Sequence, residues 1–150
     1  MQMEKQIRIM VDDTVQNLDL TIEFDHKDID EVGPMAIRTH YQGQDIVAVG
    51  TQYPYIDAFA NLQKQLPKNV QLICCVACRH GSMCPVGNAP DEVFCTKDVQ
   101  ITRKSDLYRY TEEPDEVGKR SRHYGDSCDD FRPQEEAFYT YSDYIFYLNE

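Results

Sequence analysis

The sequence predicts an α+β fold: an N-terminal antiparallel sheet covered by one helix, a loop-rich cysteine and metal module, and a short C-terminal helix. Three observations support this. Polar and apolar residues alternate in the first half, one stretch there has helical spacing, and all six cysteines lie between residues 74 and 128. We expect one domain over 1–150, made of a sheet plus helix (1–73), a cysteine-rich loop module (74–133) and a C-terminal aromatic helix (134–150).

The first strands are predicted from alternation with a period of two. Residues 18–24 place Leu18, Leu20, Ile22 and Phe24 on one side, with polar residues between them. Residues 6–12 alternate in the same way. Since this pattern is typical of strands with one buried face, and the link between the two stretches is rich in turn residues, the pair predicts a hairpin.

Further strands are expected over residues 35–41, 46–49 and 70–75. The acidic stretch 25–31, which precedes a Gly-Pro pair, predicts a loop, and residues 42–45 predict a turn.

A helix is predicted over residues 54–66. Its apolar face consists of Tyr55, Phe59, Leu62 and Leu66, spaced at i, i+4, i+7 and i+11. A proline opens this stretch and another follows it, as is common at helix boundaries.

The C-terminal residues predict a second, shorter helix. Tyr141, Tyr144, Ile145 and Leu148 have helical spacing, and Thr140 with Asp143 resembles a capping box. We expect this helix to pack against the core; an exposed aromatic face that binds a partner is the alternative.

Composition restricts the class of protein. The chain has 150 residues, of which 41% are hydrophobic and 27% charged, and its net charge is −11. Such acidity disfavours nucleic acid as a partner, because binding phosphates relies on lysine and arginine. With no long apolar run and a polar start, we expect a cytoplasmic protein that does not enter a membrane. The acidity is explained most simply by solubility, and the alternative is a basic protein partner or mimicry of nucleic acid.

The cysteine pattern predicts a metal site. Cys75 and Cys78 form a C-x2-C pair, and two thiolates at this spacing can bind one metal ion. Cys95 and Cys128 complete a set of four possible metal ligands. Both lie in the segment 79–133, which shows little periodicity of apolar residues and therefore needs another interaction to stabilise its structure. We therefore expect structural zinc bound by Cys75, Cys78, Cys95 and Cys128, with Cys84 or His80 as a replacement for one ligand.

Other interpretations of the cysteines remain open. Four thiolates also suit an iron–sulfur cluster, and Cys75 with Cys78 could form a redox-active disulfide, although that motif should open a helix. Unrelated structural thiols are a further alternative. Cys74 shares a strand face with Val70 and Leu72, so we expect it to be a buried apolar residue and not a ligand.

Four segments of the sequence carry a resemblance to a known family. They are Cys-x2-Cys-x-His-Gly at 75–81, Phe-Cys at 94–95, Cys-Asp-Asp-Phe at 128–131 and the tyrosine-rich ending at 139–144. Together they resemble a family of small uncharacterised bacterial proteins found mainly in Gram-positive species. The resemblance implies no activity. It favours Cys75, Cys78, Cys95 and Cys128 as the shared set.

The sequence contains no G-x-S-x-G elbow, phosphate-binding loop, G-x-G-x-x-G or H-E-x-x-H. We therefore expect a non-enzymatic protein-binding module with a structural metal site, resembling an immunity protein or antitoxin that neutralises a basic partner. An iron–sulfur or thiol redox protein is the alternative, and a small metal-sensing regulatory domain is a third. The oligomeric state is left open.

Overall fold

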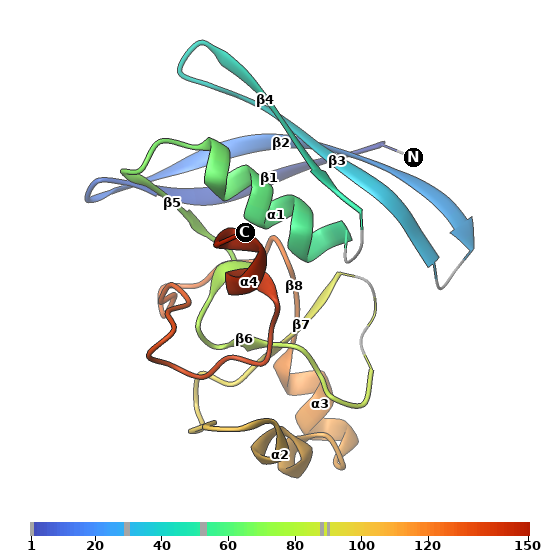
Figure 1. Ribbon diagram of the computed structural model, residues 1–150. Helices are drawn as coiled ribbons and strands as arrows, with labels where there is room; N and C mark the ends of the chain where they lie inside the picture. Colours follow the sequence, from blue (N-terminus) through green and yellow to red (C-terminus); the bar gives the residue numbers. More distant parts are fainter. Residues whose placement is uncertain (1, 29–30, 52–53, 88, 90) are drawn as a thin grey trace.

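The protein has a mixed α+β fold, with a curled antiparallel sheet, several helices and a short C-terminal helix (Figure 1). The structure is a computed structural model that describes residues 2–28, 31–51, 54–87, 89 and 91–150; within these, the side chains of 25–28, 31–33 and 54 are not described. The predicted fold class is confirmed.

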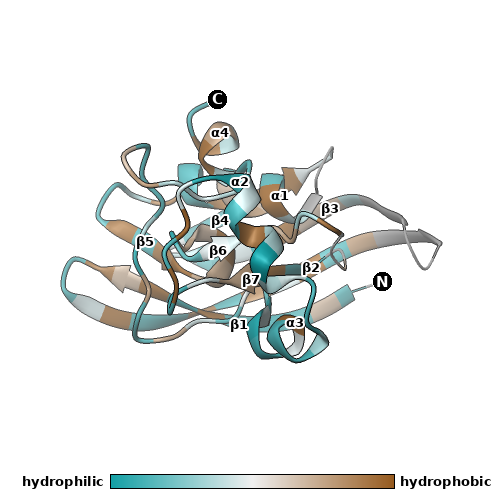
Figure 2. Cartoon of the chain, turned by 90° about the horizontal axis from the view of Figure 1, so that it is seen from below, coloured by the Kyte–Doolittle hydropathy of each residue, from teal (hydrophilic) through white to brown (hydrophobic). Residues whose placement is uncertain are grey.

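The main sheet has the strand order β4-β3-β2-β1-β5, and every neighbouring pair is antiparallel. Its strands are β1 (Gln2–Val11), β2 (Thr14–Asp28), β3 (Glu31–Tyr41), β4 (Gln44–Gly50) and β5 (Val70–Ile73). Ile7 lies opposite Leu18 in the β1–β2 hairpin, so the alternating apolar residues of both strands face the same core. Figure 2 shows the corresponding alternation of hydrophobic and hydrophilic residues along the strands.

The prediction of a loop over 25–31 is wrong for its described residues. Strand β2 continues to Asp28 and β3 begins at Glu31, with the pairs His26–Val32 and Asp28–Glu31. Strand pairing uses backbone groups, so it continues through an acidic stretch that lacks apolar alternation. The pairing shifts register on both sides of His26. Residues 29 and 30 lie outside the described part.

Helix α1 (Pro54–Gln65) covers the core face of the sheet, as predicted (Figure 1). Its buried side chains include Phe59 and Leu62. On the other side of the helix, Asn61 and Gln65 donate side-chain hydrogen bonds to the carbonyls of Val49 (2.6 Å) and Val47 (2.9 Å). These bonds tie the helix to β4, the edge strand of the sheet.

Strand β5 ends at Ile73, two residues before the predicted end. The next residues form a short 3₁₀ turn, η1 (Cys75–Ala77). The backbone N–H of Cys75 donates to the carbonyl of Asp126 (2.7 Å), and that of Val76 to Tyr124 (3.2 Å). The chain therefore leaves the main sheet because its backbone pairs with the segment around Tyr124 and Asp126 instead of with β1.

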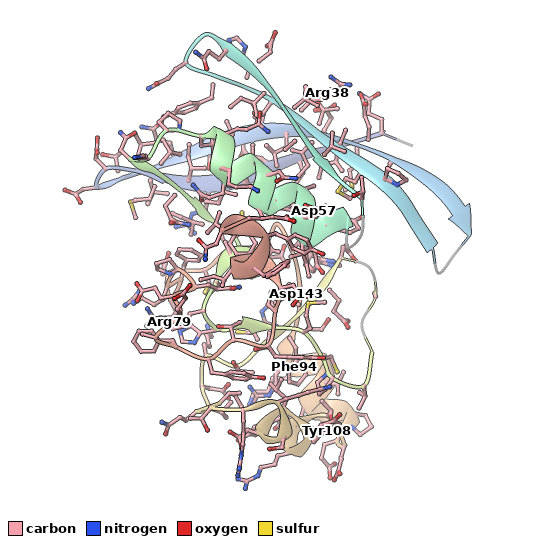
Figure 3. The ribbon with its side chains drawn as sticks, in the orientation of Figure 1. Arg38, Asp57, Arg79, Phe94, Tyr108 and Asp143 are labelled. Atoms are coloured by element: carbon pink, nitrogen blue, oxygen red, sulfur yellow. The ribbon has the colours of Figure 1, made fainter. Side chains whose placement is uncertain are left out.

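The cysteine-rich segment contains more regular structure than its sequence predicts. Strands β6 (Gly81–Ser82), β7 (Glu92–Cys95) and β8 (Ser121–His123) form a three-stranded sheet, and α2 (Lys104–Leu107), η2 (Tyr108–Tyr110) and α3 (Pro114–Arg120) lie beside it. A small core forms around Cys84, Phe94 and Leu107. Figure 3 shows Phe94 between the small sheet and α2. Elements of two to four residues are too short to show periodicity in a sequence.

The C-terminal helix α4 (Tyr144–Leu148) packs against α1 and buries Tyr144 and Tyr147, as expected of a helix docked on the core. The predicted capping box is wrong. Asp143 occupies the N-cap but makes no side-chain capping bond within the described chain, and the Thr140 hydroxyl donates to the carbonyl of Arg79 (2.7 Å). The helix begins later than predicted because Thr140 is held by a different segment.

Candidate metal centre

The four predicted ligands line one small cavity of about 50 Å³. They come from three places in the chain: the η1 turn with Cys75 and Cys78, the end of β7 with Cys95, and the loop after β8 with Cys128. The sequence separates these segments by up to fifty-three positions, and the fold brings them together. Other residues that line the cavity are His80, Gly81, Val93, Lys97, Arg122, Asp126 and Ser127.

A tight turn places Cys75 and Cys78 side by side. The N–H of Cys78 donates to the carbonyl of Cys75 (3.2 Å), and the N–H of Gly81 donates to the carbonyl of Cys78 (2.9 Å). A Cβ atom at Gly81 would overlap the Cys75 carbonyl oxygen and lie 2.9 Å from Cγ1 of Val93. Only glycine therefore allows this close approach, and Gly81 pairs with Cys95 in the small sheet.

Arg120, which is buried at the end of α3, holds the backbone of Cys95 in place. Its guanidinium donates to the carbonyl of Cys95 (3.2 Å) and to the carboxylate oxygens of Asp98 and Glu116. Both acidic partners satisfy the buried charge, as such a group requires. The end of β7 is thus fixed in place by a network that lies outside the cavity.

Cys128 lies in a loop that is held by backbone hydrogen bonds and by ion pairs. Two residues before Cys128, the carbonyl of Asp126 accepts the hydrogen bond from Cys75 described above. Two residues beyond Cys128, Asp130 pairs with Lys97 (3.1 Å), which itself lies two residues after Cys95. The loops that carry the third and fourth cysteines are therefore joined to each other.

The thiols influence one another electrostatically. Burial and the neighbouring Cys78 raise the pKa of Cys75 to about 12, with smaller contributions from Asp126, Cys95 and Cys128. Burial also raises the pKa of Cys78, although backbone N–H groups of Arg132 and His80 donate to its sulfur and oppose the shift. Negative charge on several of these sulfurs at once needs a cation, which a bound metal ion supplies.

The other two cysteines lie elsewhere. Cys74 is fully buried in the main core, on the face that the strand phase predicts, and burial raises the pKa of its thiol. Cys84 belongs to the small core with Phe94 and Leu107 and does not line the cavity. Cys84 is therefore not placed to replace a ligand, whereas His80 lines the cavity.

The thiols surround the cavity without converging on a single point. Among the residues that the structure describes, no group of three or more histidine, cysteine or acidic side chains is assembled closely enough to hold a metal ion. Binding of one metal ion by the four thiols would therefore require their side chains to move closer together.

Sequence reasoning noted that a glycine close to the C-x2-C pair eases the turn, but it did not single out Lys97 or Arg120. One signal was present: a lysine two residues after Cys95 and an aspartate two residues after Cys128 have opposite charge. The roles of Gly81 and Arg120 depend on contacts between distant segments, which spacing alone does not reveal.

Comparison with protein-family models and with curated proteins gives no match. No helix in the described ranges is both long and apolar enough to cross a membrane.

Proposed function

We propose that the protein is a non-enzymatic, cytoplasmic protein-binding module whose cysteine-rich segment is held by a structural zinc ion. The observation that supports this proposal is the sorting of the six cysteines: Cys75, Cys78, Cys95 and Cys128 line one cavity, and the other two are core residues. Four cysteines from separate segments are typical of closed structural zinc sites.

The cavity favours a single ion. Its volume is about 50 Å³, and it lies between backbone segments joined by hydrogen bonds from the Cys75 and Cys78 peptide groups. A zinc ion bound by four thiolates adds little volume, because its bonds to sulfur are about 2.3 Å long. An iron–sulfur cluster uses the same four cysteines but adds several atoms, so it is the second candidate.

The geometry gives less support to thiol redox chemistry. A reactive thiolate has a lowered pKa and commonly lies at the start of a helix. Cys75 begins a short 3₁₀ turn, and its pKa is raised. A disulfide between Cys75 and Cys78 is therefore not the function we propose.

A basic protein is the partner we propose, as for an immunity protein or antitoxin-like protein. The net charge of −11 favours association with a positively charged surface and disfavours nucleic acid.

Hydrogen exchange before and after chelation tests the structural role of the metal. If the metal holds the cysteine-rich segment, chelation should reduce protection in 74–133 and leave the main sheet and α1 protected, because binding free energy contributes to folding free energy. Cys128→Ser should have the same effect as chelation. Unchanged protection after verified metal removal would contradict the structural role. A brown sample that absorbs near about 400 nm would instead favour the iron–sulfur candidate.

A further inference from the structure

A hollow of about 420 Å³ lies along the segment between the cysteine-rich part and α4. It is lined by Gln134, Glu135, Glu136, Ala137, Phe138, Tyr139, Thr140, Ser142 and Ile145. We define Glu135, Glu136, Phe138, Tyr139 and Ile145 as the acidic–aromatic surface, because they supply its charge and its apolar area.

The acidic–aromatic surface exposes two large rings. Phe138 is 48% exposed and Tyr139 is 38% exposed, and both rings also line a second hollow on the side of residues 96–102. Glu136 is exposed and has no ion-pair partner among the described residues. No lysine or arginine is among the residues that line the first hollow. Aromatic rings beside carboxylates suit a positively charged side chain.

The chain itself shows how a guanidinium binds at this surface. The guanidinium carbon of Arg79 lies 3.6 Å from the centre of the Phe138 ring, and one of its nitrogens lies 3.5 Å from a carboxylate oxygen of Glu135. Arg79 lies at the outer edge of the cysteine-rich part, where Figure 3 labels it. Glu136 and Tyr139 offer the same two kinds of group, and within the described part of the chain neither makes an ion pair or a cation–π contact.

The segment that carries this surface is fastened to the cysteine turn at its start and to the residue after β6 at its end. At its start, the buried Gln134 donates side-chain hydrogen bonds to the carbonyls of Val76 (3.0 Å) and Cys78 (3.2 Å). At its end, the N–H of Met83 donates to the carbonyl of Tyr141 (2.7 Å). A surface held in this way is preorganised, which reduces the entropy lost when a partner binds.

We propose that the acidic–aromatic surface binds an arginine side chain presented by a basic segment of the partner protein, with Glu136 and the Tyr139 ring as its main contacts. This proposal rests on the proposed function, because it names where the basic partner binds. It also gives the metal centre a second role, since the cysteine turn holds the segment that carries the surface.

The test uses a fluorescently labelled peptide in which arginines alternate with glycine and serine, and it measures binding to the full chain by anisotropy. Glu136→Gln and Tyr139→Leu should each weaken binding about threefold to fivefold, in keeping with exposed ion-pair and cation–π contacts. Glu112→Gln is the matched control, because it removes the same charge from an exposed position outside the hollow and should leave affinity unchanged.

Equal weakening by Glu136→Gln and Glu112→Gln would overturn the proposal, because binding would then follow net charge alone. Absence of measurable binding by the unmodified chain would overturn it as well. Metal content, measured in parallel, should be the same in all three variants. A chain without metal that still shows the specific loss at Glu136 would contradict the metal centre and leave the surface supported, so the two failures are distinguishable.

Discussion

Lys97 Nζ lies 3.1 Å from Oδ2 of Asp130, and this ion pair joins the loops that carry Cys95 and Cys128. Lys97 also lines the cavity that those two cysteines share. It is thus placed to act on the metal centre in two ways, by holding two loops together and by opposing the negative charge of bound thiolates.

Replacing Lys97 with glutamine should weaken zinc binding about tenfold, the lower end of the effect seen when residues around a metal centre are changed. Lys97→Arg should retain most of the affinity, because it keeps the charge. Competition with a chromogenic chelator measures the change, and Lys64→Gln on α1 serves as the control. Equal affinities for Lys97→Gln and Lys64→Gln would show that Lys97 has no role at the metal centre.

Gly81→Ala should destabilise the protein by about 2–3 kcal/mol and reduce its zinc content, because the added Cβ overlaps the Cys75 carbonyl oxygen and crowds Val93. The matched substitution is Gly118→Ala in α3, where no atom lies within 4 Å of the added Cβ. It should be neutral or stabilise the chain by up to about 1 kcal/mol. Urea denaturation with metal analysis compares them, and similar effects of the two alanines would contradict the close approach at Gly81.

The buried Arg120 makes stability sensitive to acid. Its hydrogen bonds hold the pKa of Asp98 below the ordinary range of a carboxyl group. A lowered folded-state pKa contributes stability that is present above the unfolded pKa and is lost as the pH falls through the folded value. The contribution of Asp98 should therefore decline from about pH 5 downward.

Asp98→Asn should lower the free energy of unfolding by about 1–2 kcal/mol at pH 7. The effect is moderate because the Asp98 side chain is 46% exposed and Glu116 still pairs with Arg120. Between pH 7 and about pH 3, the difference in stability between wild type and this variant should shrink. Denaturation at both pH values measures it, and taking the difference removes effects that the two chains share. A difference that stays constant with pH would contradict the prediction.

Cys74→Ala and Cys84→Ala should each lower the free energy of unfolding by about 1–2 kcal/mol, because packing contacts are lost. Neither substitution should change the metal content. Each side chain is buried in an apolar cluster away from the cavity. Denaturation and elemental analysis of both variants provide the check. Loss of metal from Cys74→Ala, with Cys75→Ala tolerated, would show that the assignment of these adjacent cysteines is reversed.

Much of the main sheet follows from the sequence, since alternation in residues such as Leu18, Leu20 and Ile22 reflects one buried face. The limits of the strands do not, because β2 extends to Asp28 through backbone pairing that side-chain patterns do not encode. Likewise β5 ends early because Cys75 pairs with Asp126, a residue about fifty positions away.

The different environments of Cys74 and Cys75 could be predicted better than the structure around them. The C-x2-C spacing and the strand phase sorted Cys74 from Cys75, and both positions agree with the structure. The contributions of Gly81, Lys97 and Arg120 depend on how distant segments meet. The aromatic ending was predicted as a helix, but only five residues are helical, and Phe138 and Tyr139 lie in the loop before it.

The metal content of the native protein tests the central claim most directly. Native mass spectrometry of protein purified without an affinity tag that carries metal should show one zinc ion per chain in the wild type, Cys74→Ala and Cys84→Ala. The ion should be lost from Cys128→Ser, which removes one of the four ligands. A wild-type chain that carries no metal even after incubation with zinc, with the cavity thiols all free to react, would contradict the account.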